Sequence, residues 1–96
     1  MKPSVAFEQN REFIREAAAR RKTTNPRVFG SVLHGTDHEG SDVDILVDAL
    51  PGADLFDLGG LQADLEDQLG VRVQVVLPGE LHRFYRDKVL AEAKPV

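Results

Sequence analysis

Two short groups of residues between Val28 and Asp48 have side chains that could do chemistry. Asp42 and Asp44 lie on either side of one valine and lead into the apolar run Ile45–Val47. Side chains at positions i and i+2 of a strand lie on the same face, so these carboxylates should point the same way, with Cα atoms about 6–7 Å apart. Parallel carboxylates repel unless a cation lies between them, and a hard divalent cation such as Mg²⁺ prefers oxygen ligands. We therefore predict a magnesium site at Asp42 and Asp44.

Gly30 and Ser31 end a shorter apolar run ten residues before the acids. A glycine at the end of a strand lets a phosphate approach the backbone. A serine at the start of a helical turn offers a hydroxyl and free backbone N–H groups, which bind anions. A phosphate-binding turn that faces a metal-binding acid pair is typical of phosphoryl or nucleotidyl transfer. The alternative is that the acid pair only caps a strand.

The hydrophobic spacing predicts three helices around these residues. Val5–Lys22 has apolar residues at helical intervals, with Ser4 as its N-cap. Leu55–Leu69 carries leucines at intervals of 3, 3, 4 and 4, and Gly70 should end that helix. Leu81–Ala93 is the last predicted helix, with Tyr85 on its apolar face and therefore in the core.

Short apolar runs predict the strands. Arg27–Gly30 follows a breaker at Thr23–Pro26, Val43–Val47 is a buried strand, and Val71–Leu77 alternates as a third strand. Gly35–Ser41 should be a loop, with a short helical turn before it. The expected fold is α/β (α+β): a small mixed sheet of three to four strands flanked by helices.

Composition limits the classes of protein to consider. Ninety-six residues predict a single domain over residues 1–96, and the absence of cysteine excludes disulfides and thiolate zinc sites. A net charge of −4 argues against direct nucleic-acid binding, which needs a basic surface. No apolar run is long enough to span a bilayer, and no signal peptide is evident, so we expect a cytoplasmic protein without a membrane partner.

The stretch GSVLHGTDHEGSDVD resembles the GS-x10-DxD motif of the minimal nucleotidyltransferases, in the DNA polymerase beta superfamily. Gly30, Ser31, Asp42 and Asp44 match that motif residue for residue, and Ser41 also looks like the family. The resemblance extends over nearly the whole chain. It implies a nucleotidyltransferase core in which Asp42 and Asp44 hold Mg²⁺, while Gly30, Ser31 and Ser41 bind the phosphates of ATP.

Many proteins of this family are antitoxins paired with a HEPN-domain toxin. The resemblance therefore implies transfer of AMP from ATP to a tyrosine hydroxyl of such a toxin, encoded by a neighbouring gene. Larger enzymes of this chemistry carry a second domain for the acceptor. A chain of this length has no room for one, so a partner presenting the acceptor is expected on size alone.

The sequence departs from the family pattern at two positions. The family's third carboxylate is expected on the next strand, where the position falls on Gln74, which completes the candidate catalytic set with Asp42 and Asp44 but brings no charge and cannot act as a general base. The alternative is that the alignment slips by a residue and Gln74 is only a polar residue on an exposed strand face. Either the site works at a reduced rate, or the protein neutralises its partner by binding alone. His34 stands where relatives often carry arginine, so it either contacts phosphate or is an exposed loop histidine.

Overall fold

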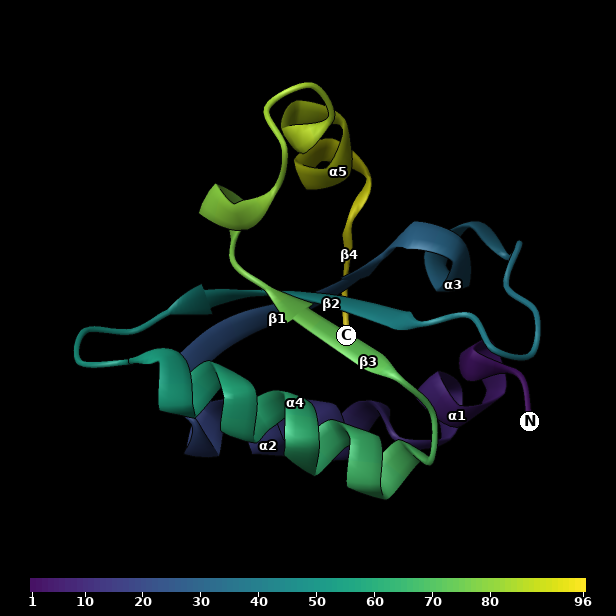
Figure 1. The fold of residues 1–96 in the computed structure, drawn as a ribbon, viewed down its shortest axis with the longest axis horizontal. Coiled ribbons are helices and arrows are strands. Elements are labelled where there is room, and N and C mark those ends of the chain that lie inside the picture. Colours follow the sequence, from purple (N-terminus) through teal and green to yellow (C-terminus); the bar gives the residue numbers. More distant parts are fainter.

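A computed structural model describes residues 1–96 as a mixed α/β fold built on a four-stranded sheet of order β3-β2-β1-β4 (Figure 1). β2 runs antiparallel to β1 and parallel to β3, while β4 pairs antiparallel with β1. This confirms the predicted fold class. The elements in chain order are α1 (Pro3–Gln9), α2 (Arg11–Arg20), β1 (Thr23–Phe29), α3 (Gly30–His34), β2 (Val43–Ala49), α4 (Leu55–Leu69), β3 (Val73–Val76), the 3₁₀ turn η1 (Pro78–Glu80), α5 (Arg86–Glu92) and β4 (Lys94–Pro95).

The sheet has one face packed on helices and one face that carries the candidate site. α2 and α4 cover the first face, whereas α5 and η1 stand on the other side (Figure 1). Alternate residues of β2, including Val43, Ile45 and Val47, belong to the hydrophobic core and are fully buried. The intervening Asp44 therefore lies on the opposite face, as the strand periodicity predicted.

The first predicted helix is wrong as a single element, because it breaks at Asn10. Asn10 leaves helical geometry with φ −128° and donates its side-chain amide to the Ala6 carbonyl at 2.8 Å. Such local side-chain bonds compete with helix formation. Ser4 is not the N-cap, since Lys2 holds that position. The Ser4 backbone N–H instead donates to the buried Asp37 carboxylate at 2.8 Å, and this bond lowers the Asp37 pKa.

The predicted breaker Thr23–Pro26 is also wrong, because β1 already begins at Thr23. The register against β2 shifts between Thr24 and Arg27, so Asn25 and Pro26 form an irregularity inside the strand. Asn25 has a positive φ of 54°. A bulge removes the need for a ladder hydrogen bond at Pro26, which has no N–H to give.

The C-terminal region departs most from expectation. The last helix begins at Arg86 rather than Leu81, and the chain then adds β4 beside β1. Tyr85 was expected in the core, but it is 51% exposed, and Phe84 next to it is 81% exposed. Only Leu81 of this segment is buried against the body of the protein.

No helix has the length and apolar character that crossing a membrane requires.

Candidate active site

The register of β1, β2 and β3 brings the predicted site residues together. Asp44 lies opposite Phe29 of β1 on one side and beside Gln74 of β3 on the other. Gly30 follows Phe29 directly, so the turn into α3 begins next to the Asp44 carboxylate. Residues that are separated by up to 44 positions in the sequence thus meet at one end of β2.

Gly30 is required here for two separate reasons. Its φ of +72° lies in the left-handed region, which side chains with a Cβ rarely adopt. A Cβ at this position would also overlap the Oδ2 atom of Asp44. The glycine therefore allows the backbone at the start of α3 to lie directly against a carboxylate of the acid pair.

Asp42 presents an oxygen that lacks a conventional partner. Its Oδ1 atom is buried and accepts no hydrogen bond. The Arg72 Nε atom lies 3.1 Å from it, which is an ion-pair distance, but the geometry is not that of a hydrogen bond. A buried carboxylate oxygen without a hydrogen bond is costly unless a cation compensates it.

Asp44 also shows that the acid pair is under-compensated. Burial, and secondarily the charge of Asp42, raises the pKa of Asp44 to about 6. A carboxylate with this shift gains strongly from a nearby cation. The donor set of two carboxylates, with the Gln74 amide beside Asp44, therefore fits a hard divalent ion.

No third acid completes this donor set. The structure has no cluster of three or more histidine, cysteine, aspartate or glutamate side chains that could hold a metal ion. Gln74 lies on β3 directly beside Asp44, which is the position expected for the family's third carboxylate, and its side chain is exposed. Asp48 is too far along β2 and binds Arg27 at 2.8 Å instead.

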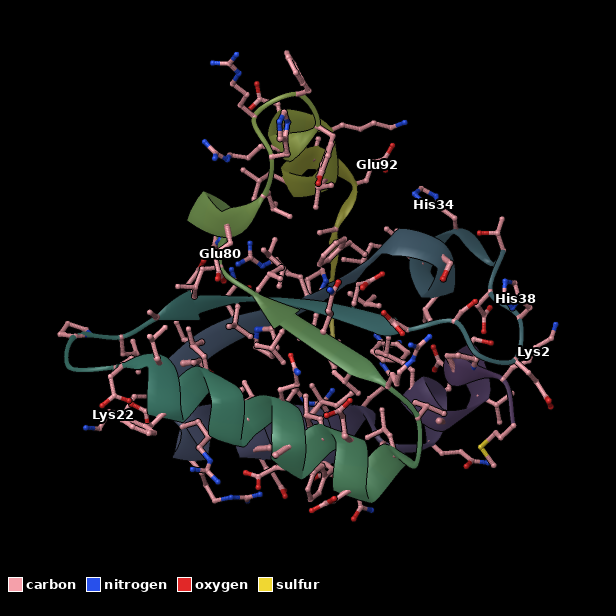
Figure 2. All side chains as sticks on the ribbon, viewed as in Figure 1. Lys2, Lys22, His34, His38, Glu80 and Glu92 are labelled. Atoms are coloured by element: carbon pink, nitrogen blue, oxygen red, sulfur yellow. The ribbon has the colours of Figure 1, made fainter.

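Ser41 and His34 have other contacts in this structure. The Ser41 hydroxyl accepts the His38 backbone N–H at 3.1 Å and closes the turn before β2. The His34 Nε2 atom lies 3.0 Å from the Glu92 carboxylate, so this side chain ties α3 to α5, as the two facing residues in Figure 2 show. His34 therefore points at α5 and is paired there, which neither of the two interpretations of this residue had included.

Arg72 is the residue of this region to which the sequence had assigned no role. Besides approaching Asp42, it donates from Nη2 to the Gly40 carbonyl at 2.7 Å. The available signal was its position two residues before Gln74, on the same face of the predicted strand. Its partners could not be read from the sequence, because they depend on the pairing of β2 with β3.

Comparison with known proteins agrees with this geometry. Residues 10–96 match the family model described as "Nucleotidyltransferase domain". A relative from Methanocaldococcus jannaschii that carries a protein adenylyltransferase name is 39% identical over 69 residues, covering 72% of this chain and 74% of the relative. Protein adenylyltransferase MntA of Thermococcus cleftensis is 42% identical over 65 residues, covering 68% of this chain and 66% of the relative.

Solved structures give the same result. A minimal nucleotidyltransferase structure superposes with a TM-score of 0.86 at 39% identity, covering 97% of this chain and 95% of the other. A structure described as a toxin–antitoxin with AMP-PNP has a TM-score of 0.75 at 26% identity, covering 90% of this chain and 71% of the other. The chain belongs to the nucleotidyltransferase domain family, as the resemblance of its motif predicted, and it is a nucleotidyltransferase of the minimal type.

Proposed function

We propose that this protein transfers AMP from ATP to a tyrosine hydroxyl of a partner HEPN-domain toxin, and that it thereby acts as the toxin's antitoxin. The observation that carries the proposal is the packing of the Gly30 backbone against the Asp44 carboxylate, together with the buried Oδ1 of Asp42, which accepts no hydrogen bond. A cation held by the two carboxylates would lie beside the turn that we propose as the phosphate-binding element. The adenylyltransferase names of relatives and the toxin–antitoxin neighbour support the choice of AMP and of a toxin.

The residues of the site would divide the work as follows. Asp42 and Asp44 would hold Mg²⁺, which when bound supplies charge neutralisation and orientation for the phosphates. Gly30, Ser31 and Ser41 would bind the phosphates of ATP, Ser31 through its hydroxyl and the backbone N–H groups around it. Gln74 would offer its amide oxygen or amide N–H groups as neutral contacts beside Asp44. We further propose that residues 1–96 form the single domain that does this.

The reaction balances without another reactant. The acceptor hydroxyl oxygen forms a bond to the α-phosphorus of ATP, and the bond from that phosphorus to the bridging oxygen of the β-phosphate breaks. Pyrophosphate leaves, and the hydroxyl proton passes to solvent or to an oxygen of the site. Gln74 cannot accept this proton, since a neutral amide is not a base at physiological pH.

Gln74 also favours a second candidate function. Because Gln74 replaces an acid beside Asp44, the site has less negative charge with which to hold metal and nucleotide. The alternative is therefore a catalytically weak or inactive homologue that neutralises the toxin by binding it. Both functions need a partner, but only nucleotidyl transfer modifies the partner covalently.

Labelled ATP separates the two functions. The purified protein, Mg²⁺ and the product of the neighbouring gene are incubated with ATP that is labelled either at the α-phosphate or at the γ-phosphate. Nucleotidyl transfer predicts α-label on the partner and no γ-label, and the combined Asp42→Asn and Asp44→Asn variant should lose the signal. A stable complex with neither label on the partner would support neutralisation by binding and contradict the transfer reaction.

A further inference from the structure

Arg72 lies close enough to the acid pair for its positive charge to repel a cation bound there. Its Nε atom is 3.1 Å from Asp42 Oδ1, and its Nη2 donates to the Gly40 carbonyl at 2.7 Å. The guanidinium is therefore held across the turn that precedes β2, although its side chain is 74% exposed. It is the only cationic side chain that forms an ion pair with either acid of the site.

We propose that Arg72 is an internal counter-ion of the acid pair, which competes with the divalent cation for Asp42 and thereby lowers the metal affinity of the site. The inference rests on the proposed function in one respect, namely that Asp42 is a metal ligand. A guanidinium that stays in place would repel a divalent ion held by the same carboxylate. A guanidinium that swings away would leave the Asp42 oxygen free but lose its own ion pair.

The size of the effect follows from the exposure of the pair. Charges a few ångströms apart near a protein surface interact strongly enough to change a binding constant several-fold, and salt weakens the interaction. Since Arg72 is largely exposed, we expect its removal to tighten metal binding by about fivefold at low ionic strength, and by less in high salt. The absence of a third acid makes the competition more important, because two carboxylates must satisfy both cations.

The opposite role is physically possible and gives the opposite sign. Arg72 could instead fix the Asp42 carboxylate and the Gly40 turn in the orientation that binds metal. In that case its removal would weaken metal binding. The sign of the change therefore distinguishes competition from positioning.

The test measures the binding of Mn²⁺ in place of Mg²⁺, by electron paramagnetic resonance of the free ion and by calorimetry, with no turnover required. Arg72→Gln removes the charge but keeps a donor for the Gly40 carbonyl, whereas Arg72→Lys keeps the charge. Arg83→Gln is the matched control, because it removes one positive charge from an exposed arginine that packs over Phe84. Thermal unfolding of each variant checks that the fold is kept.

The proposal expects Arg72→Gln to bind Mn²⁺ about fivefold more tightly, with Arg72→Lys and Arg83→Gln close to wild type. Unchanged or weaker binding in Arg72→Gln would overturn it, as would equal tightening in Arg72→Lys. The metal site itself is tested separately by Asp42→Asn, which should abolish binding. If wild type and Arg72→Gln both fail to bind Mn²⁺, the metal site of the proposed function is overturned together with this inference.

Discussion

Replacing Gly30 with alanine gives the sharpest test of how the backbone and the acid pair fit together. The new Cβ would enter a left-handed conformation, with φ +72°, at a cost of about 1–2 kcal/mol. It would also overlap Asp44 Oδ2, so that the carboxylate or the turn must move. Disturbing the groups that orient a metal ligand typically lowers metal affinity or activity by about 10–100-fold. We therefore expect a melting temperature lower by roughly 4–8 °C per kcal/mol lost, and Mn²⁺ binding at least about tenfold weaker.

Gly35→Ala is the matched control for this substitution. Gly35 ends the same short helix with nearly the same φ, +71°, but a Cβ there would have no atom within 4 Å. It should carry the same backbone cost and leave Mn²⁺ binding unchanged. Calorimetry of Mn²⁺ binding and thermal unfolding, measured on both variants, separate strain from contact. If Gly30→Ala binds Mn²⁺ as well as Gly35→Ala does, the argument from close packing against Asp44 is wrong.

Gly59→Ala is expected to raise the free energy of unfolding by about 1 kcal/mol, because a helical glycine is costly and nothing lies within 4 Å of the added Cβ. Gly60→Ala should give no such gain, because its Cβ would displace the Arg21 guanidinium. Urea titrations of the two variants would compare these effects. In the metal-free protein the contribution of Asp44 to the free energy of unfolding should fall as the pH rises from about 4 to about 6. The pKa of Asp44 is raised to about 6, so the folded state binds that proton more tightly than the unfolded state does, and Asp44→Asn should lose this slope in denaturant titrations over that range. Gln74→Asp should tighten Mn²⁺ binding by about tenfold, since it adds a third carboxylate beside Asp44. Calorimetry would measure this, and a Gln74→Asn control should show no gain.

The parts of the fold that rest on local patterns could be predicted from the sequence. The leucine spacing placed the long helix at Leu55–Leu69, and Asp54 caps it while Gly70 ends it with φ 72°. The apolar run after Asp42 predicted the buried strand and put Asp44 on the face away from the core. These features depend on neighbours within a turn or on the two-residue period of a strand, which the sequence displays directly.

The errors lie where a distant residue decides the local structure. In the first turn of α1 the Ser4 backbone N–H donates to Asp37, which is 33 residues away. At the break, the Asn10 side chain accepts a hydrogen bond from the distant Gln68 in addition to its local bond to Ala6. The sequence predicts too long a last helix, because Phe84 and Tyr85 were expected on its apolar face, whereas both are exposed and their rings lie beside the His82 ring. No local pattern distinguishes an exposed aromatic residue from a buried one.

The residues of the candidate site could be predicted from the sequence, but the contacts between them could not. Sequence spacing and the family motif identified Gly30, Asp42, Asp44 and Gln74, and the strand register brings Asp44 and Gln74 side by side. The roles of these residues stay predictions until they are measured. The close approach of Gly30 to Asp44 and the contacts of Arg72 with Asp42 could not be predicted, since each depends on the alignment of two strands that are far apart in the sequence.

The central claim is that a site with two carboxylates and Gln74 still transfers AMP to a protein. The most direct measurement is the intact mass of the neighbouring gene product after incubation with this protein, ATP and Mg²⁺, beside a parallel reaction with the Asp44→Asn variant. The account predicts a mass increase of one or more AMP units on the partner with the wild-type protein, and none with the variant. An unmodified partner that nevertheless stays bound to the wild-type protein would contradict it.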